Sequence, residues 1–258
     1  MEFVKKGDIV SRISYNNDII FFIERIITFD NGIKVAILKG VTIRIEADAP
    51  IEDLKLCNED CLDEQFFFEN NSENSRYISN FRGYGKILHL DGDRNYSEKT
   101  AKYYENKGLN FIVKHIAEYN QPMVVKSLLM ELKPNILVIT GHDGMIKKGR
   151  NYQDINNYRN SKYFYKSVIE ARNLIPNKDE LIIFAGACQS FYEALISAGA
   201  NFASSPARIL IDFVDPLVVA EKVSITNKNR IILMSDLEDK IRNGRKAISG
   251  IGARGKCL

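Results

Sequence analysis

The sequence predicts an α/β protein in which a parallel sheet carries helices on both faces and follows a small β-rich module. Three observations predict this class. The first fifty or so residues contain short runs rich in Ile, Val and Phe, divided by turn residues. From Gly85 onward, apolar runs alternate with helical patterns. Those runs are continuous in Ile, Leu and Val, which is typical of parallel strands covered on both faces.

Residues 1–55 are predicted to form the β-rich module. The turn sequences Asn16-Asn17-Asp18 and Asp30-Asn31-Gly32 divide it, and strands are expected at 8–13, 19–27, 33–38 and 41–47. Four or five strands in about fifty residues favour an SH3-like barrel acting as a docking or substrate-presenting module. The acidic and Asn/Ser-rich residues 56–84 are predicted to be a linker or peripheral segment.

Residues 85–258 are predicted to form the main domain. Its strands are expected at 86–90, 110–115, 135–140, 181–185, 201–204 and 230–234. Its helices are expected at 97–107 (with Ser97 as N-cap), 121–132, 161–173, 190–198 and 216–223. Ligands of such sheets bind at the carboxyl ends of the strands, so chemistry is expected there.

Two of these strand ends carry reactive side chains. The 135–140 strand runs into Gly141-His142-Asp143-Gly144, and the 181–185 strand runs into Gly186-Ala187-Cys188-Gln189-Ser190. One right-handed crossover joins the strands, so they are expected to be neighbours about 4.8 Å apart. His142 and Cys188 would then reach a common substrate atom, as a base and a nucleophile do.

Other features of these turns fit catalysis. A helix starting near Gln189 would direct its positive end at the Cys188 thiol and lower the thiol pKa. Backbone N–H groups of Asp143, Gly144 and Cys188 could form an oxyanion hole. The glycines at 141, 144 and 186 would supply positive φ angles or close backbone approach. The alternative for each reactive residue is structural: a small buried cysteine and a hydrogen-bonding histidine.

The order of the two residues separates classes of cysteine enzyme. His142 precedes Cys188 by 46 positions, and no histidine follows Cys188. Papain-like enzymes and glutamine amidotransferases need a histidine after the cysteine, whereas caspases place it about fifty residues before. The segment resembles the caspase-like cysteine peptidases, which include legumains, gingipains, clostripain-like enzymes and separases. That resemblance implies a caspase-like sandwich.

A closer resemblance covers the whole chain. It rests on KKGDIVSRISYNNDIIFFI, ILHLDGD, VITGHDG, FAGACQSFYEALISAGANFASSPARI and GIGARG, and it is to the YabG family of sporulation-specific peptidases. It implies limited proteolysis of spore coat and germination proteins next to a basic (Arg) residue. The implied location is the cytoplasm of the mother cell, with a possible association with the spore coat. The implied catalytic dyad falls on His142 and Cys188.

Preference for arginine would require an acidic group in the substrate pocket, because an unpaired buried guanidinium is costly. Clostripain-like enzymes carry that acid two residues before the cysteine, where this chain has Gly186. Ser204 and Ser205 are expected to wall the pocket, with Asp212 and Asp215 as the best candidate acids. The alternative for Asp215 is that it caps a helix beginning at Pro216.

Composition limits the partners. The net charge of +3 does not predict a nucleic-acid protein, and no apolar run is long enough to span a membrane. The basic, aromatic loop 145–160 could contact nucleic acid, but its place after His142 favours a lid over the substrate groove. The expected partners are protein substrates.

No cofactor or metal is predicted. Cys57 and Cys61 lack a second pair of ligands at zinc spacing. Asp91-Gly92-Asp93 could hold metal or phosphate, but a turn is the stronger interpretation.

Two other hypotheses stay open at the level of sequence. One is a non-catalytic spore-coat scaffold whose N-terminal module recruits partners. The other is self-cleavage within the linker, near Arg76 or Arg82.

Overall fold

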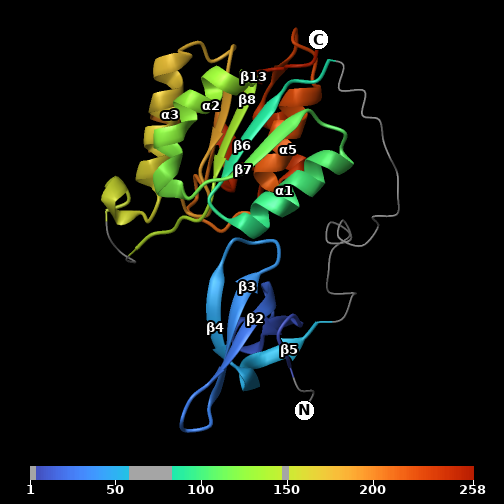
Figure 1. Cartoon of the computed structure of the whole chain (residues 1–258), viewed down its shortest axis with the longest axis vertical. Coiled ribbons are helices and arrows are strands. Elements are labelled where there is room, and N and C mark those ends of the chain that lie inside the picture. Colours follow the sequence, from blue (N-terminus) through green and yellow to red (C-terminus); the bar gives the residue numbers. More distant parts are fainter. Residues whose placement is uncertain (1–3, 58–82, 147–150) are drawn as a thin grey trace. The chain divides into compact units, whose positions relative to one another are not determined.

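The structure is a computed structural model that describes residues 4–57, 83–146 and 151–258. The chain divides into two compact units, residues 1–75 and 76–258 (Figure 1). Most of the predicted 56–84 linker lies outside the described residues, as do Cys61, Arg76, Arg82 and residues 147–150 of the predicted lid.

The N-terminal unit contains a five-stranded antiparallel sheet in the order β4-β3-β2-β1-β5. Its strands are β1 (Ile9–Arg12), β2 (Ile20–Thr28), β3 (Lys34–Gly40), β4 (Glu46–Pro50) and β5 (Leu54–Leu56). The strand predicted at 41–47 lies further along the chain than predicted, because β4 runs from Glu46 to Pro50. The Gly40 N–H instead donates to the Ile45 carbonyl, and the Ile45 N–H donates to the Ile43 carbonyl, so the chain turns there.

The second unit is built on a six-stranded sheet in the order β12-β10-β9-β8-β6-β7. Neighbouring strands are parallel except for β12, which is antiparallel to β10. The strands are β6 (Ile87–Asp91), β7 (Phe111–His115), β8 (Ile136–Thr140), β9 (Ile182–Ala185), β10 (Phe202–Ser204) and β12 (Ile248–Gly250).

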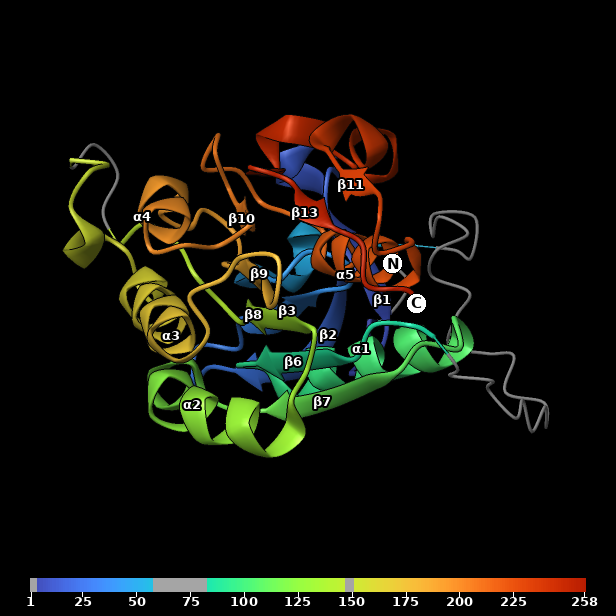
Figure 2. The same cartoon turned by 90° about the horizontal axis from the view of Figure 1, so that it is seen from above.

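Helices cover both faces of this sheet, so the predicted mixed α/β architecture is confirmed. Figures 1 and 2 show α2 and α3 on one face and α1 and α5 on the other. The helices are α1 (Arg94–Asn106), α2 (Gln121–Leu132), α3 (Ser161–Leu174), α4 (Tyr192–Ser197) and α5 (Asp215–Ile225). The core on the first face joins Leu137 and Ile183 of the sheet to Val125 of α2 and Phe164 of α3.

Short 3-10 helices fill several connections. In the N-terminal unit they are η1 (Ile13–Tyr15) and η2 (Ile51–Asp53). In the second unit they are η5 (Glu118–Asn120), η6 (Ile155–Asn157), η7 (Met234–Asp236), η8 (Glu238–Lys240) and η9 (Gly244–Lys246).

The start of α1 differs from the prediction. Its N-cap is Asp93 rather than Ser97, because the Asp93 carboxylate accepts the N–H groups of Asn95 at 2.8 Å and Tyr96 at 3.1 Å. Ser97 lies inside the first turn and donates its hydroxyl to the Asp93 carbonyl. This shift places a carboxylate just beyond the end of β6.

The end of the chain also differs from the prediction. The predicted 230–234 strand is reduced to β11 (Ile231–Ile232), which pairs with β13 (Ala253–Arg254) in a separate two-stranded sheet. The place of a sixth strand in the main sheet is taken by β12, whose register with β10 pairs Ser204 with Ile248.

His89 has a structural role in the core. Its fully buried ring lies 3.1 Å from the Tyr104 hydroxyl of α1 and 2.7 Å from the Thr140 hydroxyl of β8.

None of the helices in the described part of the chain has the length and apolar character that a membrane span requires.

Candidate active site

The two reactive strand ends lie side by side, as the topology predicts. β8 and β9 are parallel neighbours in which Ile139 is paired with Ala185. His142 follows β8 by two residues, and Cys188 follows β9 by three. The structure therefore brings the His142 loop and the Cys188 loop to the same edge of the sheet.

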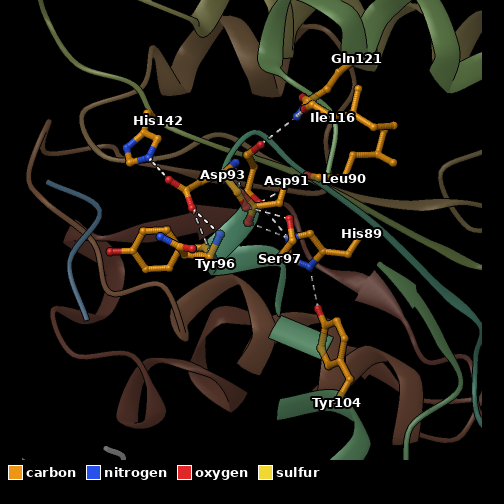
Figure 3. Close-up of polar contacts among 12 residues, drawn as sticks. His89, Leu90, Asp91, Asp93, Tyr96, Ser97, Tyr104, Ile116, Gln121 and His142 are labelled. Carbon is orange, nitrogen blue, oxygen red and sulfur yellow. Dashed lines mark hydrogen bonds and ion pairs between the residues drawn. The ribbon is translucent and has the colours of Figure 1, made fainter. Parts of the chain in front are cut away.

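His142 is paired with a carboxylate from a third strand end. Its Nε2 atom lies 2.9 Å from Oδ2 of Asp93, and Figure 3 shows the imidazole directed at that carboxylate. The pairing follows from the sheet, because β6 is the other parallel neighbour of β8 and Asp91 is in register with Thr140. The sequence pattern indicated only a turn at Asp93, so this contact was missed.

The charge on Asp93 determines which ring nitrogen of His142 is basic. Burial alone would raise the pKa of the Asp93 carboxyl, but hydrogen bonds from His142 and the Tyr96 N–H, with the charge of His142, outweigh it and lower that pKa to about 2. A carboxylate can only accept a hydrogen bond, so Nε2 of His142 must carry the proton. Nδ1 is then the nitrogen that can accept another proton.

Glu118 of η5 holds the backbone of His142. Its Oε1 accepts the His142 N–H at 2.7 Å. The carboxylate fits here only because two turns lack side chains: a Cβ atom would lie 2.3 Å from Oε1 at Gly141 and 2.2 Å from the carboxyl carbon at Gly92. Gly141 therefore allows close approach rather than a positive φ. No sequence pattern indicated Glu118.

Gly186 has the positive φ that the sharp turn after β9 was predicted to need. Its φ is +108°, and a Cβ there would lie 2.8 Å from both Leu195 and Ser204 side-chain atoms. Gly144, in contrast, has no positive φ, and a Cβ at that position would meet Gln189 Oε1 at 3.3 Å. The Gly144 N–H, a predicted oxyanion donor, donates to Asp143 Oδ1 at 2.9 Å.

The predicted 190–198 helix is present as α4, but its predicted start near Gln189 is wrong. α4 begins at Tyr192 and has 6 residues, so its N-terminus does not directly follow Cys188. Gln189 has a φ of +55°, and the Ser190 hydroxyl accepts the Ala187 N–H at 2.8 Å. This local turn occupies the positions that a helix would need.

Cys188 is buried, with 1% of its surface exposed. The Ile211 N–H donates to its Sγ at 3.4 Å, and the thiol faces the Ile211 carbonyl at 3.7 Å. The Gln189 N–H donates to the Ile209 carbonyl at 3.0 Å. The backbone of residues 209–211 therefore runs along the cysteine turn and covers the sulfur.

Arg208 anchors this covering segment. Its guanidinium donates to the Tyr158 hydroxyl at 2.8 Å and to the Ser205 carbonyl at 3.0 Å, and it pairs with Glu193. The Tyr158 ring, which lies in the loop predicted as a lid, is buried and stacks on Phe191 with a centroid distance of 5.2 Å. Tyr158 is thus part of the packed wall of the site.

The predicted pocket residues lie on both sides of the covering segment. Ser204 ends β10, and its buried hydroxyl has no partner among the described residues. Ser205 exchanges hydrogen bonds with Ile209 at 2.9 and 3.0 Å. Asp212 follows Ile211, and its N–H donates to Asp215 Oδ2 at 3.1 Å. The structure thus brings Asp212 and Asp215 together, close in the chain to the residue that contacts Cys188.

Asp215 does not cap α5 with its side chain. The helix begins at Asp215 itself, with Val214 in the N-cap position and no side-chain cap bond. Its carboxylate instead accepts the backbone N–H groups of Asp212 and Arg242. Both Asp212 and Asp215 are buried.

The described residues hold no group of three His, Cys, Asp or Glu side chains suited to a metal.

Asp215 makes the stability of the protein depend on pH. Burial, followed by the negative charge of Asp212, raises the pKa of Asp215 to about 7. The folded state then holds a proton that an unfolded Asp releases near its ordinary pKa of 3.8. Stability is therefore expected to fall as pH rises from about 4 to 7, by about 4 kcal/mol from this group.

Urea unfolding of the full chain at pH 4 and pH 8 measures this loss. Asp215→Asn is expected to remove most of it, whereas Asp239→Asn, at an exposed position, is expected to retain it. An Asp215→Asn variant that loses as much stability as the unsubstituted chain would show that Asp215 does not titrate in this range.

Comparison with known proteins shows the family of the chain. The family described as "YabG peptidase U57" matches residues 5–76 and 62–258 of the chain. The chain is also similar to "Sporulation-specific protease YabG" of Bacillus subtilis (strain 168). The two are 36% identical over 274 aligned residues, covering 96% of this chain and 94% of that relative. This chain belongs to the YabG family and is a peptidase.

Proposed function

We propose that this peptidase is a cysteine endopeptidase in which Cys188 is the nucleophile, His142 the general base and acid, and Asp93 the group that orients His142. The observation that carries the proposal is the His142–Asp93 hydrogen bond of 2.9 Å at the carboxyl end of β8, next to the strand end that bears Cys188. A nucleophile, a base and an orienting group are the three parts of such a site.

The reaction would proceed in two steps. His142 Nδ1 takes the thiol proton, Sγ attacks the scissile carbonyl carbon, and the imidazolium returns the proton to the departing amine. This leaves a thioester on Cys188. Water then gives a proton to His142 and attacks the thioester, which releases the carboxylic acid and restores the thiol. Asp93 stabilises the imidazolium in both steps because its carboxylate remains ionised.

The oxyanion would be stabilised by the backbone N–H groups of Cys188, Asp143 and Gly144. For Gly144 to contribute, its N–H must leave Asp143 Oδ1. Substrate must also displace the backbone around Ile211, because Cys188 is buried beneath it. The described conformation is thus a resting state, and catalysis requires the covering segment to move.

The proposed substrates are spore coat and germination proteins, cut next to a basic residue. The proposed location of the enzyme is the cytoplasm of the mother cell, in association with the spore coat. Asp212 and Asp215 are the proposed acids of the arginine pocket, with Ser204 and Ser205 on its wall. Their support is position and burial: both acids are buried near the residue that contacts Cys188. A guanidinium would also relieve the repulsion between them.

The finer descriptions of the fold and domains belong to the same proposal. We take residues 85–258 as a caspase-like domain, 56–84 as a linker and 1–55 as an SH3-like module that presents substrates. The His-before-Cys order and the parallel sheet with helices on both faces support the first of these. Membership of a peptidase family favours catalysis over the scaffold hypothesis. Self-cleavage near Arg76 or Arg82 would appear as a second mass in freshly made protein.

A pair of covalent probes tests the proposal. A peptide acyloxymethyl ketone ending in arginine is expected to label Cys188 and block cleavage of a peptide library, whereas the same probe ending in glutamate is not. Peptide mapping by mass spectrometry locates the adduct. An adduct at another residue, with cleavage blocked, would overturn Cys188 as the nucleophile. Equal labelling by both probes would overturn only the preference for basic residues.

A further inference from the structure

We propose that Asp143 is a positioning residue that locks the His142 loop to the Cys188 loop through Ser190. The inference rests on the proposed function, because it assigns a role in the same site. Asp143 lies between His142, the proposed base, and Gly144, a proposed oxyanion donor. Its side chain connects these residues to the Cys188 loop.

The Asp143 carboxylate accepts four hydrogen bonds. Oδ1 accepts the N–H groups of Gly144 at 2.9 Å and Asn160 at 2.8 Å. Oδ2 accepts the hydroxyls of Ser161 at 2.5 Å and Ser190 at 2.8 Å. Burial raises the pKa of the Asp143 carboxyl, whereas these hydrogen bonds act in the opposite direction. A group with two acceptor oxygens and no hydrogen suits this position best.

One arm of the network reaches the nucleophile. Ser190 is fully buried, and while its hydroxyl donates to Asp143 it accepts the Ala187 N–H at 2.8 Å. Ala187 directly precedes Cys188, and the turn between Ala187 and Ser190 is the one that replaces the predicted helix. Asp143 therefore fixes the turn that carries Cys188 although it belongs to the His142 loop.

A second arm passes through the start of α3. Asn160 donates its amide to the His142 carbonyl at 2.7 Å, and the Ser161 hydroxyl accepts the Phe191 N–H at 2.8 Å. Both residues also donate to Asp143. The two reactive loops are thus tied to the same carboxylate from both sides, by bonds that involve neither the His142 imidazole nor the Cys188 thiol.

This arrangement sets the distance between base and nucleophile. Neither catalytic side chain touches Asp143 in the described bonds, so loss of Asp143 or Ser190 would not remove a reacting group. It would let the two loops shift relative to each other. Misplacement of reacting groups by about 1 Å can cost about 100-fold in rate, whereas binding of the rest of the substrate would be little affected.

Ser190→Ala in the full chain tests the bridge to Cys188. We expect kcat for the peptide cleaved best in the library to fall about 10- to 100-fold while KM stays within about threefold. Labelling of Cys188 by the arginyl acyloxymethyl ketone should slow in parallel. Ser161→Ala removes another donor to the same oxygen and the acceptor of the Phe191 N–H, but it keeps the Ala187–Ser190 bond, so its loss should be smaller. Ser197→Ala, on an exposed position of α4, should have no effect.

Asp143→Asn and the double variant test whether the residues act as a unit. Asp143→Asn should lower kcat at least as much as Ser190→Ala, and the double variant should be no slower than the slower single variant. If Asp143→Asn does not fold, the comparison of Ser190→Ala with Ser161→Ala decides.

A Ser190→Ala enzyme with unchanged kcat and labelling rate would overturn the positioning role, as would losses that multiply in the double variant. Changed melting temperature with unchanged kcat would show a purely structural role and would also overturn it. Failure of the unsubstituted chain to be labelled at Cys188 is a different result, because it overturns the proposed function itself.

Discussion

Cys188→Ala and His142→Ala are each expected to reduce peptide hydrolysis by about 1000-fold or more, to a rate close to that without enzyme. The first variant lacks the atom that forms the thioester, and the second lacks the base that removes the thiol proton. Initial rates on the best library peptide, measured at equal concentrations of folded protein, give the comparison. Cys257→Ala is the matched control, because it removes another cysteine of the same unit.

The double variant separates a working pair from two independent losses. Residues that act in one step are not additive, so Cys188→Ala with His142→Ala should be no slower than either single variant. Retention of a tenth or more of the activity by Cys188→Ala would exclude the thiol as the nucleophile. Retention of activity by His142→Ala alone would exclude only the histidine.

Strands and helices with strong periodicity could be predicted from the sequence. The continuous apolar runs of β8 and β9 matched the prediction within a residue, and α2 has the predicted bounds. β8 is parallel to both of its neighbours, β6 and β9, as predicted for this sheet. Local sequence is sufficient here because both faces of each strand are buried, so that almost every side chain is apolar.

Elements set by tertiary contacts were missed. β12 has 3 residues and includes Gly250, and it is a strand only because it pairs with β10. The Ala187 N–H donates to the Ser190 hydroxyl and forms a turn there. Because of this turn, α4 begins at Tyr192 rather than at the predicted position. Two residues near α1 were suitable N-caps, Asp93 and Ser97, and local rules do not rank them.

Only part of the site could be predicted, because the rest of it is also set by tertiary contacts. His142 and Cys188 follow strong strands, so the topology placed them on one edge of the sheet. Asp93 and Glu118 contact His142 across 49 and 24 positions of sequence. Neither of these separations along the sequence corresponds to a known motif. The nearest usable signal was Asp91-Gly92-Asp93, since a carboxylate at the end of a neighbouring strand can reach His142 once the strand order is known.

Asp93→Asn is expected to lower kcat by about 100- to 10,000-fold with KM nearly unchanged. Asparagine caps a helix as well as aspartate does, so the cap of α1 on the Asn95 and Tyr96 N–H groups should survive. The change acts on His142 alone. A neutral amide does not stabilise the imidazolium, and an amide N–H facing Nε2 favours the ring tautomer with its proton on Nδ1, which cannot then accept the thiol proton.

Asp93→Ala separates the two roles of this residue. It should lose as much activity as Asp93→Asn and should also be less stable by about 1 kcal/mol, because the cap is lost. Asp154→Asn, at the cap of η6, controls for changing a cap carboxylate elsewhere. If Asp93→Asn keeps kcat within threefold, the 2.9 Å contact with His142 serves only to close the turn after β6, and His142 must be oriented by its backbone bond to Glu118.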